Sequence, residues 1–111
     1  MPLQRTETYT TTGTKASWNC DPSITPFALS VMCALISGTV DYKLQYSYDT
    51  LDGPLDTDAS AVWIDSDGIP AGTTGSAEEN FSGAPIARVR LVIAAISGSL
   101  KMTMLQGFSS N

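Results

Sequence analysis

The segment from Val40 to Asp49 alternates apolar and polar residues without a break. Successive side chains of a β-strand point to opposite faces, so a period of two predicts a strand with one buried and one wet face. The even-numbered residues are predicted to form the buried face: Val40, Tyr42, Leu44, Tyr46 and Tyr48. The odd-numbered residues are predicted to form the wet face: Asp41, Lys43, Gln45, Ser47 and Asp49. This pattern restricts the chain to a fold built on a β-sheet.

The preceding segment, Phe27 to Ile36, is mostly apolar on both faces, which predicts a central strand covered on both sides. Ser37-Gly38 then predicts a hairpin turn into the alternating strand. The tetrapeptide Ile36-Ser37-Gly38-Thr39 recurs 60 residues later as Ile96-Ser97-Gly98-Ser99, between segments 86–96 and 100–107. We therefore expect two long hairpins to supply most of the core.

Shorter strands are expected at 15–20, 61–64 and 78–85, separated by loops rich in Asp, Gly and Pro. No segment of helical length shows a 3.6-residue period. The predicted fold class is all-β, a single antiparallel β-sandwich over residues 15–111, with a jelly roll as one form of it. Residues 1–14 are predicted to be an N-terminal arm. Residues 5–12 have no apolar face, which indicates an arm or an edge strand that needs a partner surface to become ordered.

The composition excludes several classes of function. The 111 residues include no histidine, which removes Ser-His-Asp and Cys-His catalysis and metal sites that need an imidazole. The net charge of −5 does not suit a nucleic-acid binder or an anionic membrane surface. We expect a protein that is not an enzyme and has no cofactor, nucleic-acid or membrane partner.

The N-terminal segment has no apolar region of the kind found in signal peptides, so folding in a reducing cytosol is expected. Cys20 and Cys33 are then predicted to be free thiols, with Cys33 in the core. The segment from Asp41 to Glu79 contains nine carboxylates and a single basic residue, Lys43, whereas the remainder of the chain is net basic. Two uses of this asymmetry stay open: acidic loops that keep the protein soluble, or one part of the chain facing another across a subunit contact.

The acidic loops hold the weak candidates for a metal site. Asp65 and Asp67, followed by Gly68, resemble the start of a calcium loop, but Ser76 stands where the bidentate Glu is required. Asp and Gly are also common turn formers, so no metal is assigned. Paired carboxylates of a glycoside hydrolase would need a deep cleft that a chain of this size rarely supplies. Trp18 and Trp63 could form a sugar-stacking platform, whereas the tyrosines at strand spacing favour a place in the core.

The order of the strand residues resembles a group of small tailed-bacteriophage virion structural proteins. The resemblance covers roughly Pro26 to Gln106. The residues that carry it are Thr25-Pro26-Phe27, Ser37-Gly38-Thr39-Val40, Tyr42 to Asp49, Ala61-Val62-Trp63, Pro85 to Leu91, and Ser97 to Gln106. The sequence departs from that pattern at Asn80-Phe81-Ser82-Gly83.

The resemblance implies a capsid decoration, or cement, protein on the outside of a phage head, made in the host cytoplasm. Its partners would be the major capsid protein and further copies of itself, as a dimer or trimer. The arm would lie over a neighbouring subunit and gain strand-like hydrogen bonds. Its contact residues would be Arg5, Glu7, Tyr9 and Lys15. Alternatives are a head–tail, tail or fibre component, or a carbohydrate-binding module.

Overall fold

A computed structural model describes residues 3–20, 28–48, 61–82 and 86–106. These residues form one antiparallel sheet, so the all-β prediction is confirmed. The seven strands are β1 (Leu3–Tyr9), β2 (Gly13–Thr14), β3 (Trp18–Asn19), β4 (Ala28–Ser47), β5 (Ile64–Asp65), β6 (Ala77–Ser82) and β7 (Arg88–Gln106). Within the described ranges, no helix is long and apolar enough to cross a membrane.

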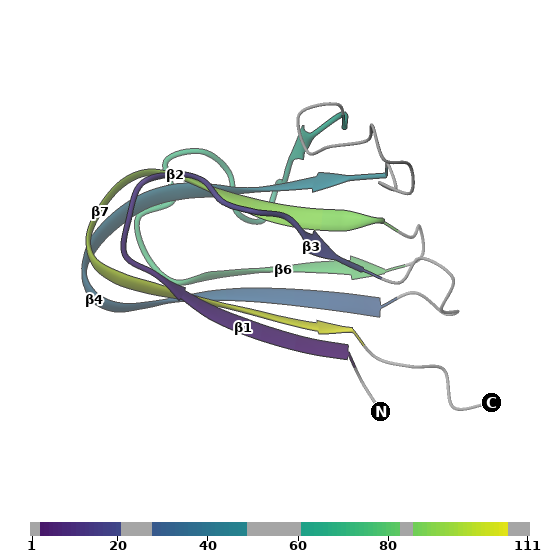
Figure 1. Ribbon diagram of the computed structural model, residues 1–111, viewed down its shortest axis with the longest axis horizontal. Helices are drawn as coiled ribbons and strands as arrows, with labels where there is room; N and C mark the ends of the chain where they lie inside the picture. The colour runs from purple at the N-terminus through teal and green to yellow at the C-terminus, as the bar shows by residue number, and fades with distance from the viewer. Residues whose placement is uncertain (1–2, 21–27, 49–60, 83–85, 107–111) are drawn as a thin grey trace.

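The two longest strands, β4 and β7, pair with each other along nearly their whole length. Figure 1 shows both strands turning back on themselves at the same end of the molecule. The expected hairpins at Ser37-Gly38 and Ser97-Gly98 are therefore wrong. Ser-Gly is a bend inside each strand, and Gly38 pairs with Gly98 across the ladder. The paired residues are 60 positions apart at Gly38 and Gly98, and no local pattern specifies such a distant pairing.

Glycine is required where the two strands bend together. Gly38 has a φ of 74° and Gly98 a φ of 116°, values that favour glycine over any residue with a Cβ. A Cβ added to Gly38 would overlap the Ser97 carbonyl, and one added to Gly98 would overlap the Ser37 carbonyl. The repeated Ser-Gly is thus the place where two backbones come too close for side chains.

In each long strand, the residues that face the core are odd-numbered before the bend and even-numbered after it. Register shifts lie between Leu35 and Ser37 and between Asp41 and Tyr42, so Ile36 and Ala94 are the extra residues. An extra residue of this kind is a β-bulge, which reverses the alternation and increases the local bend. The inward residues of β4 are consequently odd-numbered before the bend and even-numbered after it: Leu29, Val31 and Cys33; Val40, Tyr42 and Leu44.

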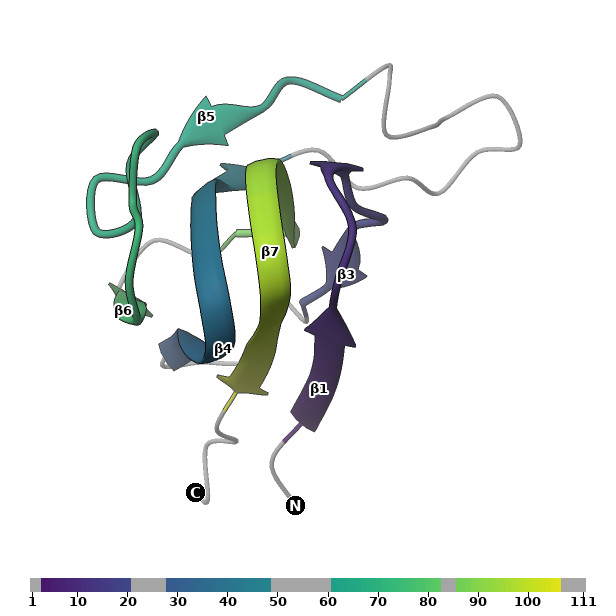
Figure 2. The ribbon, with the colours of Figure 1, turned by 90° about the vertical axis from the view of Figure 1, so that its left-hand side faces the viewer.

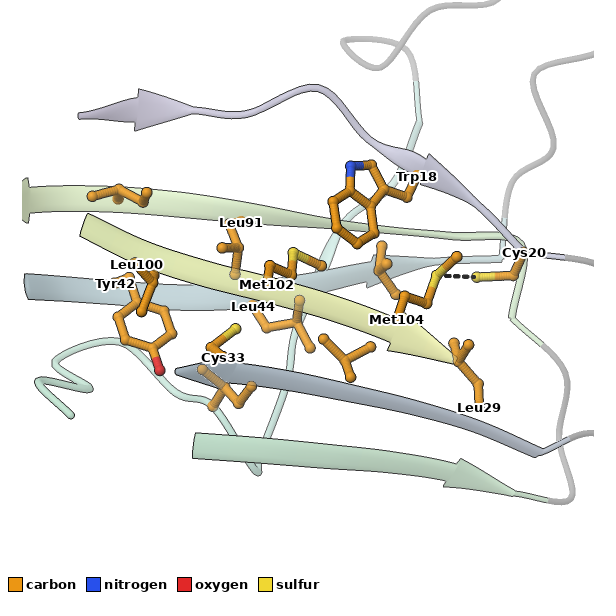
Figure 3. Close-up of a cluster of buried hydrophobic side chains, with 14 of the residues drawn as sticks. Trp18, Cys20, Leu29, Cys33, Tyr42, Leu44, Leu91, Leu100, Met102 and Met104 are labelled. Carbon is orange, nitrogen blue, oxygen red and sulfur yellow. Dashed lines mark hydrogen bonds between the residues drawn. The ribbon is translucent and has the colours of Figure 1, made fainter. Parts of the chain in front are cut away.

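The bend divides the sheet into two halves that face each other. We call them the β1 half (β1, 100–106 of β7, 28–35 of β4, and β6) and the β5 half (β2, β3, 88–93 of β7, 40–47 of β4, and β5). The core lies between them, as Figure 3 shows. Its fully buried side chains include Trp18, Leu29, Leu44, Leu91, Leu100, Met102 and Met104.

One expectation about the core is wrong. The segment around 27–36 is not covered on both sides, because Met32 is 51% exposed and Ile36 is 58% exposed. The hydrogen bonding also describes one bent sheet and not the two separate sheets of the expected sandwich or jelly roll. The sheet supplies both layers itself, since its sharp bend brings one apolar face onto itself.

Candidate functional site

The first edge of the sheet is β1, which lies in the segment predicted to be an arm. All seven of its residues, from Leu3 to Tyr9, pair with β7 between Leu100 and Gln106. The partner surface that orders this polar segment is therefore the chain's own sheet. Residues 4–8 are exposed, and only Tyr9 is half-buried. β1 is a long, regular and polar edge strand.

Three of the four residues predicted to make contacts in the arm, Arg5, Glu7 and Tyr9, lie in this edge strand, whereas Lys15 follows β2 and bonds through its amide to the Leu91 carbonyl in the β5 half. Arg5 and Glu7 pair with Met104 and Met102, two buried residues, so both charged side chains fall on the inner face of the sheet. The Arg5 guanidinium lies 4.9 Å from the centre of the Trp18 ring. Burial, followed by the Glu7 charge, raises the pKa of Tyr9 to about 12. Lys15 Nζ donates to Thr11 Oγ1 at 2.7 Å and to the Thr12 carbonyl at 3.1 Å.

The second edge of the same half is β6, which pairs with 28–33 of β4. Its inner face carries a carboxylate, because Glu79 pairs with the fully buried Val31. Glu79 Oε2 accepts hydrogen bonds from Ser66 Oγ at 2.6 Å and from the Gly68 amide at 2.8 Å. These bonds fasten the edge of the β1 half to the segment that follows β5. Glu79 was not predicted from the sequence, because its place within the run of acidic residues gives no signal for this role.

The edges of the β5 half are irregular by comparison. On one side stand β2 and β3, each two residues long. On the other side, β5 pairs with two residues of β4. The segment after β5 contacts β4 through separate backbone hydrogen bonds: the Leu44 amide donates to the Ile69 carbonyl at 3.0 Å, and the Tyr42 amide donates to the Thr73 carbonyl at 3.0 Å. A regular strand cannot be added to such an edge as readily as to β1 or β6.

Figure 2 places β1 and β6 on opposite sides of β7 and β4. Four strands, each antiparallel to its neighbour, make up this half in the order β1, β7, β4 and β6. An even number of antiparallel strands leaves the two outermost strands running in opposite directions. Among the described residues, no strand pairs with the outer edge of either β1 or β6.

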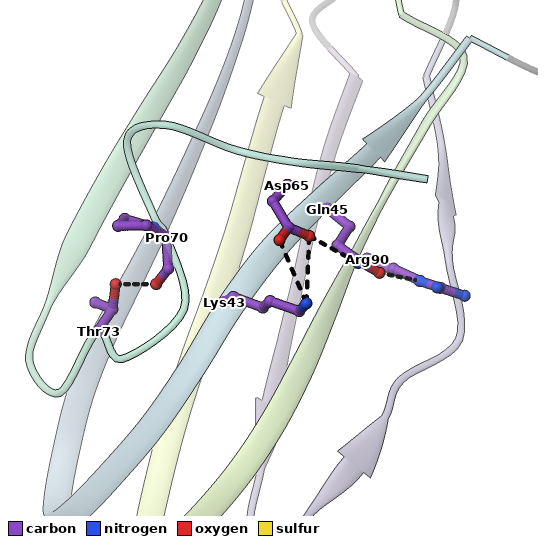
Figure 4. Close-up of polar contacts among 6 residues, drawn as sticks. All are labelled: Lys43, Gln45, Asp65, Pro70, Thr73 and Arg90. Atoms are coloured by element: carbon purple, nitrogen blue, oxygen red, sulfur yellow. Dashed lines mark hydrogen bonds and ion pairs between the residues drawn. The ribbon is translucent and has the colours of Figure 1, made fainter. Parts of the chain in front are cut away.

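Asp65, one of the two weak metal candidates, lies on the outer face of the β5 half beside Lys43 and Gln45 (Figure 4). Asp65 is fastened to its neighbours, with Lys43 Nζ 3.3 Å from Oδ1 and Gln45 Nε2 donating to Oδ1 at 2.9 Å. The hydrogen bond from Gln45, followed by the one from Lys43, lowers the pKa of Asp65 below its ordinary value. Asp67 is exposed. In the described part of the chain, no three His, Cys, Asp or Glu side chains gather where they could hold a metal ion.

The aromatic residues do not form a sugar-stacking platform. Trp18 is 1% exposed and belongs to the core, and Tyr42 is equally buried, as its strand spacing predicts. The Arg90 guanidinium lies 4.0 Å from the centre of the Trp63 ring. Arg90 Nε in turn donates to Gln45 Oε1 at 2.8 Å. Trp63 is thus covered by an arginine of its own chain.

Both cysteines are buried free thiols, as predicted for Cys33. Burial raises the pKa of Cys20 and of Cys33 to about 12. Cys20 Sγ lies 4.0 Å from Met104 Sδ, at the end of the core. A thiol that stays protonated and buried at neutral pH is a poor nucleophile, so neither cysteine is poised for chemistry.

A pocket of about 240 Å³ lies on the outer face of the β5 half, near Lys43 and Val92. Pockets that bind drug-sized ligands commonly measure about 300–1,000 Å³. The pocket wall contains one carboxylate and one ammonium group, from Asp41 and Lys43. These two groups suit a small surface depression better than a reaction centre. The edges of the β1 half are therefore the candidate functional site.

Comparisons with protein-family models and with curated proteins found no match. A comparison with solved structures found similarity to a structure described by the words "Bacillus endospore appendages form a novel family of disulfide-linked pili". The TM-score is 0.39 and the sequence identity 15%, over 97% of this chain and 89% of that chain. A similarity of this size establishes no function for the present chain, whose own sheet edges are the stronger guide.

These findings overturn the resemblance to bacteriophage virion proteins. No protein-family model matches, and the Ser37-Gly38 and Ser97-Gly98 segments that carried the resemblance are bends inside β4 and β7 and not hairpins. The predictions of a cement protein, of the major capsid protein as partner and of a place on the phage head are wrong. The alternatives of another virion component and of a carbohydrate-binding module are wrong as well. Strand order was misleading because alternation and turn residues recur in unrelated β-proteins.

Proposed function

We propose that this chain is a non-enzymatic structural subunit that associates with copies of itself, edge to edge, into a fibre. The single observation that carries the proposal is the pair of long, regular edges, β1 and β6, on opposite sides of the β1 half. The residues predicted as an arm are assigned here to one of these edges, where they would contact a neighbouring copy.

The strand directions support head-to-tail growth. Because β1 and β6 run in opposite directions, β1 of one copy can pair in antiparallel fashion with β6 of the next. The added pair leaves a new β1 and a new β6 at the two ends. A contact between two different surfaces that does not close on itself generates an open filament. β1 has seven residues and β6 has six, so the two edges are matched in length.

The uncharged outer face of β1 also supports close contact. The outward-facing positions of β1 include Gln4, Thr6 and Thr8, which carry no charge. Main-chain hydrogen bonds would supply the affinity, as in other cases of strand addition. Inward-pointing charges such as Arg5 and Glu79 restrict which strand can be added, because an unmatched charge at an edge opposes pairing.

A disulfide link is not part of this proposal. The similar structure is described as disulfide-linked. Cys20 is 9% exposed and Cys33 fully buried in the present chain, and burial holds both thiols protonated. The proposed contact therefore uses backbone hydrogen bonds of the sheet edges.

The test uses two adjacent proline variants of the full chain, Thr6→Pro and Glu7→Pro. Successive amides of an edge strand point alternately toward the sheet and toward solvent, and proline has no amide hydrogen. One variant therefore loses a bond to β7, whereas the other loses only an outward-facing donor. Thermal unfolding of the monomer identifies which is which.

Sedimentation velocity then measures association of the two variants and of the unsubstituted chain. We expect the unsubstituted chain to form elongated species that grow with concentration. The proline variant with the unchanged melting temperature should remain monomeric. A monomeric unsubstituted chain at all concentrations would refute self-association, and full assembly of the well-folded proline variant would refute the β1 edge as its site.

A further inference from the structure

The inner faces of the two free edges carry opposite charges at corresponding positions. Arg5 lies on the inner face of β1, and Glu79 lies on the inner face of β6. In a continued sheet, the inner residues of β1 and of the neighbour's β6 must lie on the same side, because the core-facing surface must stay continuous. Odd-numbered residues of β1 then pair only with odd-numbered residues of β6.

The pairing of odd-numbered residues with odd-numbered residues allows a few registers, which differ by steps of two residues. The charges on the inner face distinguish among these registers. Placing Arg5 opposite Glu79 also places Gln4 opposite Asn80 and Thr6 opposite Glu78. Sliding the strands by two residues places Glu7 opposite Glu79, and like charges directly opposite one another destabilise a sheet. Sliding them by two residues in the other direction places Arg5 opposite Ala77, where it faces no charge.

We propose that β1 of one copy pairs with β6 of a second copy in the register that places Arg5 opposite Glu79. This inference rests on the proposed function and adds to it the residue pair that determines which strands join. The inner-face ion pair selects the register, and the facing amides of Gln4 and Asn80 stand beside it on the outer face.

Both side chains can form this contact while they keep their contacts within the chain. Arg5 is exposed, and only one face of its guanidinium faces the Trp18 ring. Glu79 directs Oε2 to Ser66 and Gly68, whereas Oε1 accepts only the Asn80 amide at 3.0 Å among the bonds described. A carboxylate has about four acceptor positions, so Oε1 can also accept from a guanidinium.

Cysteine pairs on the outer face report the register directly. Within one copy, β7 and β4 separate β1 from β6, and three strand spacings of about 4.8 Å exceed the reach of a disulfide. A disulfide between these strands therefore joins two copies. The proposed register places Thr6 opposite Glu78 and Gln4 opposite Asn80, whereas the register shifted by two residues places Thr6 opposite Asn80.

The experiment mixes differently tagged chains, each carrying one substitution, and oxidises them under native conditions. We expect covalent mixed dimers from Thr6→Cys with Glu78→Cys and from Gln4→Cys with Asn80→Cys. Thr6→Cys with Asn80→Cys should give far less covalent mixed dimer. The unsubstituted chain should give no covalent dimer, because its own thiols are buried. Cross-linking that favours the Thr6 and Asn80 pair would overturn the proposed register and leave edge-to-edge association intact.

Charge variants test the ion pair separately. Glu79→Gln should weaken association by roughly two- to fivefold and reduce its dependence on salt, since charge pairs with an exposed partner contribute about this much. Glu78→Gln is the matched control, because it removes an adjacent carboxylate that faces outward. Arg5→Glu should weaken association further and Arg5→Lys should restore most of it. Equal effects of Glu79→Gln and Glu78→Gln, with unchanged melting temperatures, would refute the ion pair.

Discussion

Substituting alanine for Gly38 should disrupt the bend on which the two-layered sheet depends. The added Cβ would overlap the Ser97 carbonyl, which belongs to the backbone of β7 and cannot rotate away. Relief requires the two strands to separate, which breaks several ladder hydrogen bonds of about 1 kcal/mol each. The φ of 74° adds about 1–2 kcal/mol of strain for a residue with a Cβ. We expect a loss of about 3–5 kcal/mol in the free energy of unfolding.

Such a loss is a large part of the total stability of a small domain, about 5–15 kcal/mol. For a chain of this length it corresponds to a fall in melting temperature of about 12–20 °C. Thermal unfolding followed by circular dichroism measures this fall, and urea unfolding measures the free energy.

Two other glycines serve as matched controls for Gly38→Ala. Gly13 has a φ of 116° but no heavy atom within 4 Å of an added Cβ, so Gly13→Ala isolates the backbone strain and should cost about 1–2 kcal/mol. Gly75 has open space and no such φ, so Gly75→Ala should lie within about 0.5 kcal/mol of the unsubstituted chain. Equal stabilities of Gly38→Ala and Gly75→Ala would refute the close approach of β4 and β7 at the bend.

Three further predictions test the core, the thiols and the outer face. Leu44→Ala should lower the free energy of unfolding by about 2–5 kcal/mol, because Leu44 is fully buried. Val62→Ala is the control, because its side chain is 69% exposed, and it should change this free energy by less than about 0.5 kcal/mol. Equal losses for the two variants, measured by urea unfolding, would contradict the placement of the core. Burial raises the pKa of both thiols from 9.0 to about 12, so the unfolded chain loses their protons first. The contribution of each thiol to stability should be constant below pH 9 and should fall by about 1.4 kcal/mol per pH unit between pH 9 and about pH 12. The Cys33→Ala variant should show a shallower fall in denaturant titrations above pH 9, and an unchanged slope would contradict the burial of Cys33. Calcium should leave the melting temperature unchanged, because Asp65 is held by Lys43 and Gln45; a rise that disappears in the Asp65→Asn variant would show a cation site instead.

The local pattern predicted core-facing residues in the middle of the long strands, because alternation depends only on the geometry of a single strand. It was wrong at the end of the alternating segment, where Ser47 is buried and Tyr48 is 56% exposed. Tyr42 and Leu44 are buried as their spacing indicates, and Val89, Leu91 and Ile93 form the inner face of β7. The short strands around Trp18, Ile64 and Phe81 also lie close to where turn residues and apolar residues placed them.

The pairing of β4 with β7 could not be predicted in this way. Ser37-Gly38 satisfies the requirements of a hairpin turn and of a bulged bend equally well, and only the partner strand decides between them. The recurrence of Ser-Gly at 97–98 was the available signal, since two glycines that face each other must occur in both strands. A single sequence does not show that the two copies of the motif meet.

The candidate site was only partly predictable for the same reason. The polar character of residues 4–8 indicates a strand that needs a partner, and the edge position of β1 agrees with that. Glu79 is one of nine acidic residues in its region, and its bonds to Ser66 and Gly68 depend on how the segment after β5 returns to β6. Such a contact follows from the tertiary arrangement and leaves no trace in local spacing.

The central claim is that two edges of one half of the sheet join copies of this chain. Oxidative cross-linking of a mixture of the Thr6→Cys and Glu78→Cys chains, followed by separation under denaturing conditions, tests it most directly. We expect a covalent mixed dimer that forms only when both substitutions are present and only while the chains are folded. The claim would be contradicted if no mixed dimer forms and the unsubstituted chain sediments as a monomer under the same conditions.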